Sequence, residues 1–261
     1  MNVSGGNYLT ANVFITGNHI RNFNRRGVKI KFNSAVVSNN IFYNTWTSTD
    51  ITDSNVVGQL GSGASAKPAW DPQAVVDMDR GEKHIISGNK FINTEYFAQI
   101  KIQTSGDELV DNIVIKDNVF TRIGSLTSSG FTDLQGSLKT VGNLIYIKPS
   151  QTNPNDKGTN ITVKDNSFDV PGYLNTCIQV NRAENVIVAD NTGLISSGAT
   201  GVSLVSVDNS INNNNNFLTP NGHVADGGAL SELDNVNITN PTTGQVLKYD
   251  GTSWINNTDL Q

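Results

Sequence analysis

The chain has 261 residues, with 24 glycines, only 7 prolines and 16% charged residues. Its formal net charge of −5 argues against nucleic acid as the main partner, because surfaces that bind phosphate backbones are rich in Lys and Arg. One cysteine, Cys177, excludes an internal disulfide framework. No charged-then-apolar leader and no run of about 18 apolar residues is present, so the sequence predicts neither a signal peptide nor a membrane span.

A phrase of alternating apolar residues that leads into an asparagine recurs along the chain. Its clearest copy is NIVIKDNVF at residues 112–120. The pivot asparagines are Asn18, Asn40, Asn89, Asn118, Asn166, Asn191 and Asn215. They are separated by 22, 49, 29, 48, 25 and 24 residues, so two intervals equal one period plus an insertion. A fixed period in the twenties predicts a solenoid.

Each period contains two predicted strands and a short third one. The repeated phrase is strand A, the third strand follows the pivot asparagine, and strand B comes after a loop. Strand B is expected at residues 28–30, 76–78, 100–102, 145–147, 178–180 and 202–204. Three strands per period resembles the right-handed parallel β-helix of the pectate-lyase-like superfamily and of phage tailspikes. The resemblance spans roughly residues 10–217 and implies an all-β fold of about seven coils, stacked ~4.8 Å apart.

Stacking of this kind would place the pivot asparagines at one corner of the coils. Asparagine tolerates a left-handed backbone, and its amide can bond to the same residue in the next coil, so we expect a structural ladder. The aromatic residues two positions later would stack inside the coils. They are Phe42, Phe91, Phe120 and Phe168.

Two insertions, at residues 44–73 and 121–142, interrupt the period between the corner and the next strand B. We expect both to rise on the same edge of the strand-B sheet, where solenoids often build binding surfaces. Trp46 and Trp70 in the first insertion are aromatic plates of the kind on which sugars stack; the alternative is that they only pack the loop. Glu95 lies at the corner between the two insertions.

The outward positions of strand B form the candidate site. They are Lys29, Lys31, Asp77, Asp79, Lys101, Gln103, Tyr146, Lys148, Gln179 and Asn181. Asp77 and Asp79 have backbones ~6.6 Å apart on one face, which is compatible with the acid and base of an inverting glycosidase. Lys101, ~5 Å away, would keep a carboxylate ionised or bind an acidic sugar.

Two interpretations of this column stay open. In the first, Asp77, Asp79 and Lys101 are catalytic, and Trp46, Trp70, Glu95, Gln103, Tyr146 and Lys148 bind substrate. In the second, the alternating Lys and Asp form a solvated ladder of cross-strand ion pairs. The families that the chain resembles usually place catalysis on this sheet, but none of their catalytic motifs matches residue by residue.

The middle residue of strand A should point outward, yet it is apolar in every copy but the one with Thr162. These residues are Phe14, Val36, Ile85, Val114, Thr162 and Ile187. An exposed apolar column needs a cover, and the simplest is the same column on neighbouring copies, as in the parallel homotrimers of phage tailspikes. The alternative is that these residues are there for their strand propensity alone.

The composition of the chain changes after Phe217, where the repeats end. Residues 218–229 are polar and Gly-rich and predict a linker, and residues 230–261 predict a small β-hairpin segment. Asp250-Gly251 is a two-residue turn signal that would set Leu247 opposite Trp254. This segment is similar to a short module of phage tail fibres and other virion proteins. The resemblance implies a virion protein that contacts other virion proteins.

The three histidines have no partner at metal-ligand spacing, so the sequence predicts no zinc site. A calcium ion on Asp77, Asp79 or Asp107 is compatible with the sequence, but the spacing does not require it. We therefore expect a phage tail-spike or fibre-type protein that recognises host surface polysaccharide without a cofactor or a membrane. Two alternatives remain, a polysaccharide hydrolase or lyase that uses Asp77 and Asp79, and a purely architectural fibre or decoration protein.

Overall fold

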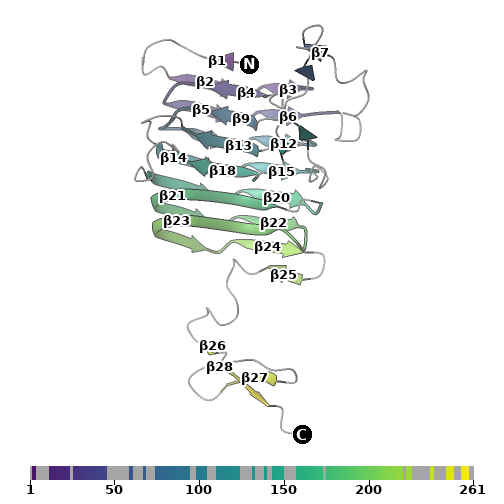
Figure 1. Cartoon of the computed structure of the whole chain (residues 1–261), viewed down its shortest axis with the longest axis vertical. Coiled ribbons are helices and arrows are strands. Elements are labelled where there is room, and N and C mark those ends of the chain that lie inside the picture. The colour runs from purple at the N-terminus through teal and green to yellow at the C-terminus, as the bar shows by residue number, and fades with distance from the viewer. Residues whose placement is uncertain are drawn as a thin grey trace.

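The computed structural model describes residues 2–3, 12–23, 26–45, 59–60, 67–68, 74–94, 98–104, 110–123, 131–132, 138–139, 143–149, 157–172, 175–219, 222–224, 236–237, 245–249 and 254–258. These residues form strands and turns, with no helix among them. Most strands are parallel and belong to one 13-stranded and one 8-stranded sheet (Figure 1). The fold is therefore all-β, with parallel strands in curled sheets, as a parallel β-helix requires.

The parallel strands lie in three columns, which the chain visits in turn; one round of visits is called a coil here. The strand-A column contains β2 (Val13–Thr16), β5 (Ala35–Ser38), β11 (Ile85–Ser87), β14 (Val110–Lys116) and β19 (Gly158–Lys164). The strand-B column contains β1 (Asn2–Val3), β4 (Val28–Ile30), β9 (Ala74–Met78), β13 (Ala98–Gln103) and β18 (Ile145–Lys148). Two longer strands, β21 (Thr176–Ala189) and β23 (Thr200–Asn213), run through both columns and join them into one sheet.

The third column begins directly after the pivot asparagines. It contains β3 (His19–Arg21), β6 (Ile41–Tyr43), β12 (Lys90–Ile92), β15 (Val119–Thr121), β20 (Ser167–Val170), β22 (Thr192–Ile195) and β24 (Asn216–Thr219). All pair in parallel with their neighbours in this column. The short third strand predicted from the sequence is thus confirmed.

The remaining short strands either pair with a strand of these columns or form separate two-stranded sheets. The strand β10 (Gly81–Glu82) pairs with β14. Each insertion carries one antiparallel pair, β7 (Gln59–Leu60) with β8 (Lys67–Pro68) and β16 (Phe131–Thr132) with β17 (Leu138–Lys139). Part of the expected linker is also paired, because β25 (Gly222–Val224) runs antiparallel to β24.

The C-terminal segment contains β26 (Val236–Asn237), β27 (Gln245–Tyr249) and β28 (Trp254–Thr258). The hairpin predicted from the sequence is present as the antiparallel pair β27–β28. Its predicted register is wrong, since Trp254 lies opposite Tyr249 and Leu247 lies opposite Asn256. The strand β27 ends at Tyr249 and β28 begins at Trp254, so the connection is longer than the two residues that the sequence suggested.

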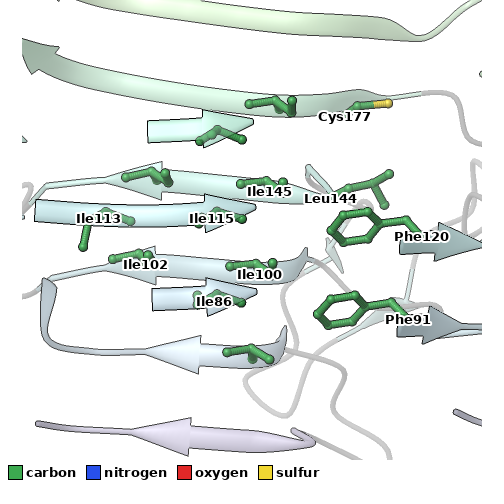
Figure 2. Close-up of a cluster of buried hydrophobic side chains, with 14 of the residues drawn as sticks. Ile86, Phe91, Ile100, Ile102, Ile113, Ile115, Phe120, Leu144, Ile145 and Cys177 are labelled. Carbon is green, nitrogen blue, oxygen red and sulfur yellow. The ribbon is translucent and has the colours of Figure 1, made fainter. Parts of the chain in front are cut away.

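The core is a row of apolar side chains that repeats from coil to coil. Strand A and strand B both place alternate Ile and Val side chains inward, and the third column adds the phenylalanines (Figure 2). Phe91 stacks on Phe42 and on Phe120 with ring centroids 5.1 and 4.8 Å apart, and Phe168 continues the stack 4.8 Å beyond Phe120. These separations match the spacing of adjacent strands, so these four consecutive coils each contribute one ring to a continuous aromatic stack.

The pivot asparagines form a continuous chain of hydrogen bonds at the corner between strand A and the third column. In each step, the backbone N–H and the Nδ2 of one asparagine both donate to the Oδ1 of the next, at 2.7–3.1 Å. The chain runs through Asn18, Asn40, Asn89, Asn118, Asn166, Asn191 and Asn215.

The expectation that the pivot asparagines themselves adopt a left-handed backbone is wrong. That conformation belongs to the preceding residue of every repeat, with φ between 52° and 70°. The residues are Gly17, Asn39, Gly88, Asp117, Asp165, Asp190 and Asn214. All are Gly, Asn or Asp, the types that adopt this conformation at least cost. The turn at that position directs the next side chain inward, where the amide is buried.

Among the described residues, one fully buried inward position of strand A is polar. The ring of His84 is fully buried; its Nε2 donates to the Arg80 carbonyl oxygen at 2.7 Å, and its Nδ1 accepts from the Ala35 N–H at 3.3 Å. Burial lowers the pKa of His84 to about 4, although the bond to Arg80 opposes the shift. The imidazole is therefore a neutral, structurally bonded part of the interior.

Candidate functional site

The strand-B column presents one row of polar side chains outward, in the register that the sequence predicted. Consecutive coils place Lys29, Asp77, Lys101, Tyr146 and Gln179 next to one another. Gln103 and Lys148 begin a second row two residues further along the strands. Because neighbouring strands are ~4.8 Å apart, these rows repeat polar groups at regular intervals along the molecule.

Asp77 is enclosed by cations. Its side chain has 0% exposure, its Oδ2 accepts a hydrogen bond from Arg26 Nε, and Lys101 Nζ lies 3.5 Å from its Oδ1. Among the described residues no hydrogen bond reaches that Oδ1, so the charge of Lys101 is what compensates it. A buried carboxylate held between two cations has the arrangement of a structural ion pair.

Asp79 has separate partners. Lys29 Nζ lies 2.8 Å and Lys31 Nζ 3.7 Å from its Oδ2, and its side chain is 29% exposed. The two aspartates therefore do not face a common open groove, which a pair of glycosidase carboxylates needs on either side of the scissile bond. The arrangement has the form of cross-strand ion pairs.

Arg26 is the site residue that sequence reasoning missed. It precedes β4, outside every repeated strand, and contacts Asp77 from a position 51 residues earlier in the chain. No periodic signal marks such a residue. The neighbouring basic pair Arg25-Arg26 and the following Gly27 were the only hints, and Gly27 is buried against the ring of Phe42 and the Val75 carbonyl.

The row beyond Lys101 is uncharged and half-buried. Asn143 Nδ2 donates to Gln179 Oε1, and Gln179 Nε2 donates to Asn181 Oδ1 at 3.3 Å. Burial raises the pKa of Tyr146, and the positive charge of Arg182 opposes that rise. The Tyr146 phenol is thus a neutral donor and acceptor beside a fixed chain of amides.

A hollow of about 370 Å³ lies at the end of this row. It is lined by Lys148, Asn181, Arg182, Val205 and Ser206. Lys148 and Asn181 are outward positions that the sequence had placed on this face. Arg182 and Ser206 adopt left-handed backbones, with φ of 49° and 54°, at the corner that leads into the strand-A column.

A second hollow, of about 440 Å³, follows the outward face of the strand-A column. Its lining consists of Asn112, Val114, Asn160, Thr162, Asn185, Val186, Ile187, Asn209 and Ile211. The floor is the apolar column expected from the sequence, in register from Phe14 to Ile211. One side is a row of asparagine amides with left-handed backbones.

A polar cluster fixes the amide row of the second hollow. Asp111 accepts hydrogen bonds from Thr159 Oγ1 at 2.5 Å, from Asn160 Nδ2 at 2.9 Å and from the Asn112 amide. Burial opposes ionisation of Asp111, but these hydrogen bonds outweigh it and lower the pKa of that carboxyl. The described residues that line this hollow include no charged side chain.

Trp46, Trp70, Glu95 and Asp107 lie outside the described residues. Within the described residues, no three His, Cys, Asp or Glu side chains gather closely enough to hold a metal ion. The same part of the chain contains no helix long and apolar enough to span a membrane.

Comparison with protein-family models, curated proteins and solved structures finds no match for this chain.

Proposed function

We propose that the chain is a right-handed parallel β-helix from a bacteriophage tail-spike or fibre-type virion protein. In this proposal its strand-B face binds host surface polysaccharide, three copies associate through the strand-A face, and residues 230–261 contact other virion parts. The parallel three-column coils and the similarity of residues 230–261 to tail-fibre modules support the assignment. The binding function needs no cofactor.

The observation that carries polysaccharide binding is the regular polar row of the strand-B face. It offers amides, a phenol and charged groups, represented by Gln103, Tyr146 and Lys148, at intervals of ~4.8 Å along one edge. A linear polymer presents hydroxyl groups repeatedly along its length, so one chain laid over this face can meet several coils. Many weak contacts of this kind add up to useful affinity when they share one ligand.

The geometry favours binding over cleavage. Asp77 is buried between Arg26 and Lys101, and Asp79 is shared by two lysines. Each carboxylate is already held in ion pairs, so neither is placed as a free acid or base beside a sugar. Ion pairing with these cations is therefore sufficient to explain why aspartates occupy positions 77 and 79.

The test is binding and product formation on a panel of purified capsular polysaccharides and O-antigens. Binding is followed by calorimetry, and cleavage by the release of reducing ends and by the absorbance of unsaturated sugars. We expect binding without products. The variant Tyr146→Ala should weaken binding roughly tenfold, equivalent to about 1.4 kcal/mol, whereas Lys90→Ala on the third column should leave it unchanged.

The other outcomes separate the alternatives. Products from the wild type that disappear in Asp77→Asn/Asp79→Asn would make the chain a depolymerase. Binding to no polysaccharide of the panel would overturn the proposal and favour an architectural protein.

A further inference from the structure

The hollow at the end of the strand-B face brings together groups from three consecutive coils. Lys148 ends β18, Asn181 and Arg182 lie in β21, and Val205 and Ser206 lie in β23. Asn181 pairs with Val205, and the next register pair is Ala183 with Val207, so Arg182 and Ser206 share the corner between these pairs. With ~4.8 Å between coils, the lining groups fall within ~10 Å of one another.

Both charged residues that line this hollow are cations. Lys148 is half-buried and takes part in none of the ion pairs that join described residues. Arg182 Nη2 donates to the Pro149 carbonyl oxygen at 2.9 Å, which holds the guanidinium at the rim. The described lining thus carries positive charge, whereas the whole chain has a formal net charge of −5.

Neutral donors complete the lining. Asn181 Oδ1 accepts from Gln179, which itself accepts from Asn143, and this chain of amides sets the orientation of the Asn181 side chain. The Asn181 Nδ2 group is therefore the part that remains as a donor toward the hollow. Ser206 adds a hydroxyl, and Val205 adds an apolar surface against which the C–H face of a sugar ring can pack.

We propose that this hollow binds an anionic group of a saccharide, either a carboxylate or a phosphate ester. The proposal rests on the polysaccharide-binding function above and adds a charge requirement to it. A lysine, an arginine and two neutral donors match the several acceptor oxygens of such a group. The described lining of the strand-A hollow includes no cation, so it lacks the groups on which this proposal depends.

The test uses small probes, so that it does not depend on knowing the polymer. Glucuronate, glycerol 3-phosphate and glucose are titrated at ~0.15 M ionic strength, where long-range attraction is screened, and amide NMR shifts are recorded. We expect the anions to shift signals of residues 148, 181, 182 and 206 and glucose to shift none. The tighter of the two anions identifies whether the group is a carboxylate or a phosphate.

Matched variants isolate the charge. Ser206→Asp and Ser206→Asn both suit the left-handed backbone at this position, but only the aspartate places a negative charge at the hollow. We expect Ser206→Asp to abolish anion binding and Ser206→Asn to retain it. Lys148→Gln should weaken binding about tenfold, whereas Lys90→Gln, with the same change in net charge on the third column, should not.

The inference is overturned if Ser206→Asp and Lys148→Gln bind the anions as the wild type does, or if glucose binds as well as glucuronate. If a polysaccharide binds and Lys148→Gln leaves the affinity for it unchanged, the anion-site inference fails while the proposed function stands. If the anion probes bind as expected and no polysaccharide does, the proposed function fails while the anion site stands.

Discussion

At the scale of single residues, the asparagine ladder depends on an amide that donates and accepts at the same time. Asn118 Oδ1 accepts from the backbone N–H and the Nδ2 of Asn89, at 3.1 and 3.0 Å. Its own Nδ2 donates to Asn166 Oδ1 and to the Ile86 carbonyl, both at 3.0 Å. All these groups are buried, so each bond that is lost leaves an unsatisfied polar group in the interior.

The variant Asn118→Asp should lower the free energy of unfolding by about 3–5 kcal/mol, because a carboxylate oxygen then faces only acceptors. Burial would raise the pKa of the new carboxyl above its usual value of about 4. The protonated form is neutral, so the deficit should shrink as the pH falls toward 4. Urea unfolding of both proteins at pH 7 and pH 4.5 measures this change.

Asn18→Asp is the matched control for this variant. Asn18 occupies the exposed end of the ladder, so solvent can reach the new carboxylate, and we expect a loss below about 1 kcal/mol. Equal losses at positions 18 and 118 would mean that burial of the ladder does not contribute to its stability.

At the scale of elements, the features that repeat were predictable and the features that occur once were not. Alternating apolar residues and the pivot asparagines predicted three strands per period and the phenylalanine stack, because every coil imposes the same packing on them. The ion pair of Arg26 with Asp77 depends on one loop, and a loop has no period from which its path can be inferred. The left-handed residue before each pivot had a readable signal, since it is always Gly, Asn or Asp.

Gly193 interrupts the phenylalanine stack, and the structure explains why. It lies in register between Phe168 and Phe217 in the third column. The rings of these two phenylalanines approach to 5.6 Å, with a tilt of 47°, across the coil in which Gly193 lacks a side chain. A Cβ at position 193 would lie 2.2 Å from the Phe168 carbonyl oxygen and 2.7 Å from the Phe168 Cβ.

Gly193→Ala should therefore destabilise the protein by about 1–3 kcal/mol, because the overlap involves backbone that cannot move alone. Gly172→Ala is the control, since a Cβ there meets nothing within 4 Å. Thermal unfolding of the two variants compares them directly. A melting temperature for Gly193→Ala equal to that of Gly172→Ala would show that the coils separate easily enough to admit the methyl group.

At the scale of the whole molecule, the outward face of the strand-A column is an apolar surface that one copy of the chain leaves exposed. Phe14 is 67% exposed, Ile85 41%, Ile187 39% and Ile211 52%, and all four lie in one column that crosses the coils. Strand propensity suits each of these residue types, Phe included, but it does not explain why large apolar side chains stay exposed along the whole column. An exposed apolar column of this length, interrupted only at Thr162, favours an interface.

We expect other copies of the same chain to cover this column. Three parallel copies related by a rotation axis along the columns bring like coils to the same height, so apolar residues meet apolar residues over the full length of the face. The strand-A hollow lies on the same column and would then be filled by the neighbouring copy. Closed symmetry also leaves the strand-B face of every copy exposed to a polymeric ligand.

Light scattering on the eluting protein tests this arrangement. The wild type should have three times the 28.1 kDa mass of one chain, and Ile85→Lys/Ile187→Lys should reduce it to a single chain, because six lysines cannot be buried together around one axis. Leu194→Lys, at an exposed position of the third column, should keep the trimer. If the wild type keeps the mass of one chain at every concentration, other copies of the chain do not cover the column, and a different protein would have to cover it. A double variant that remains trimeric would move the interface to another face.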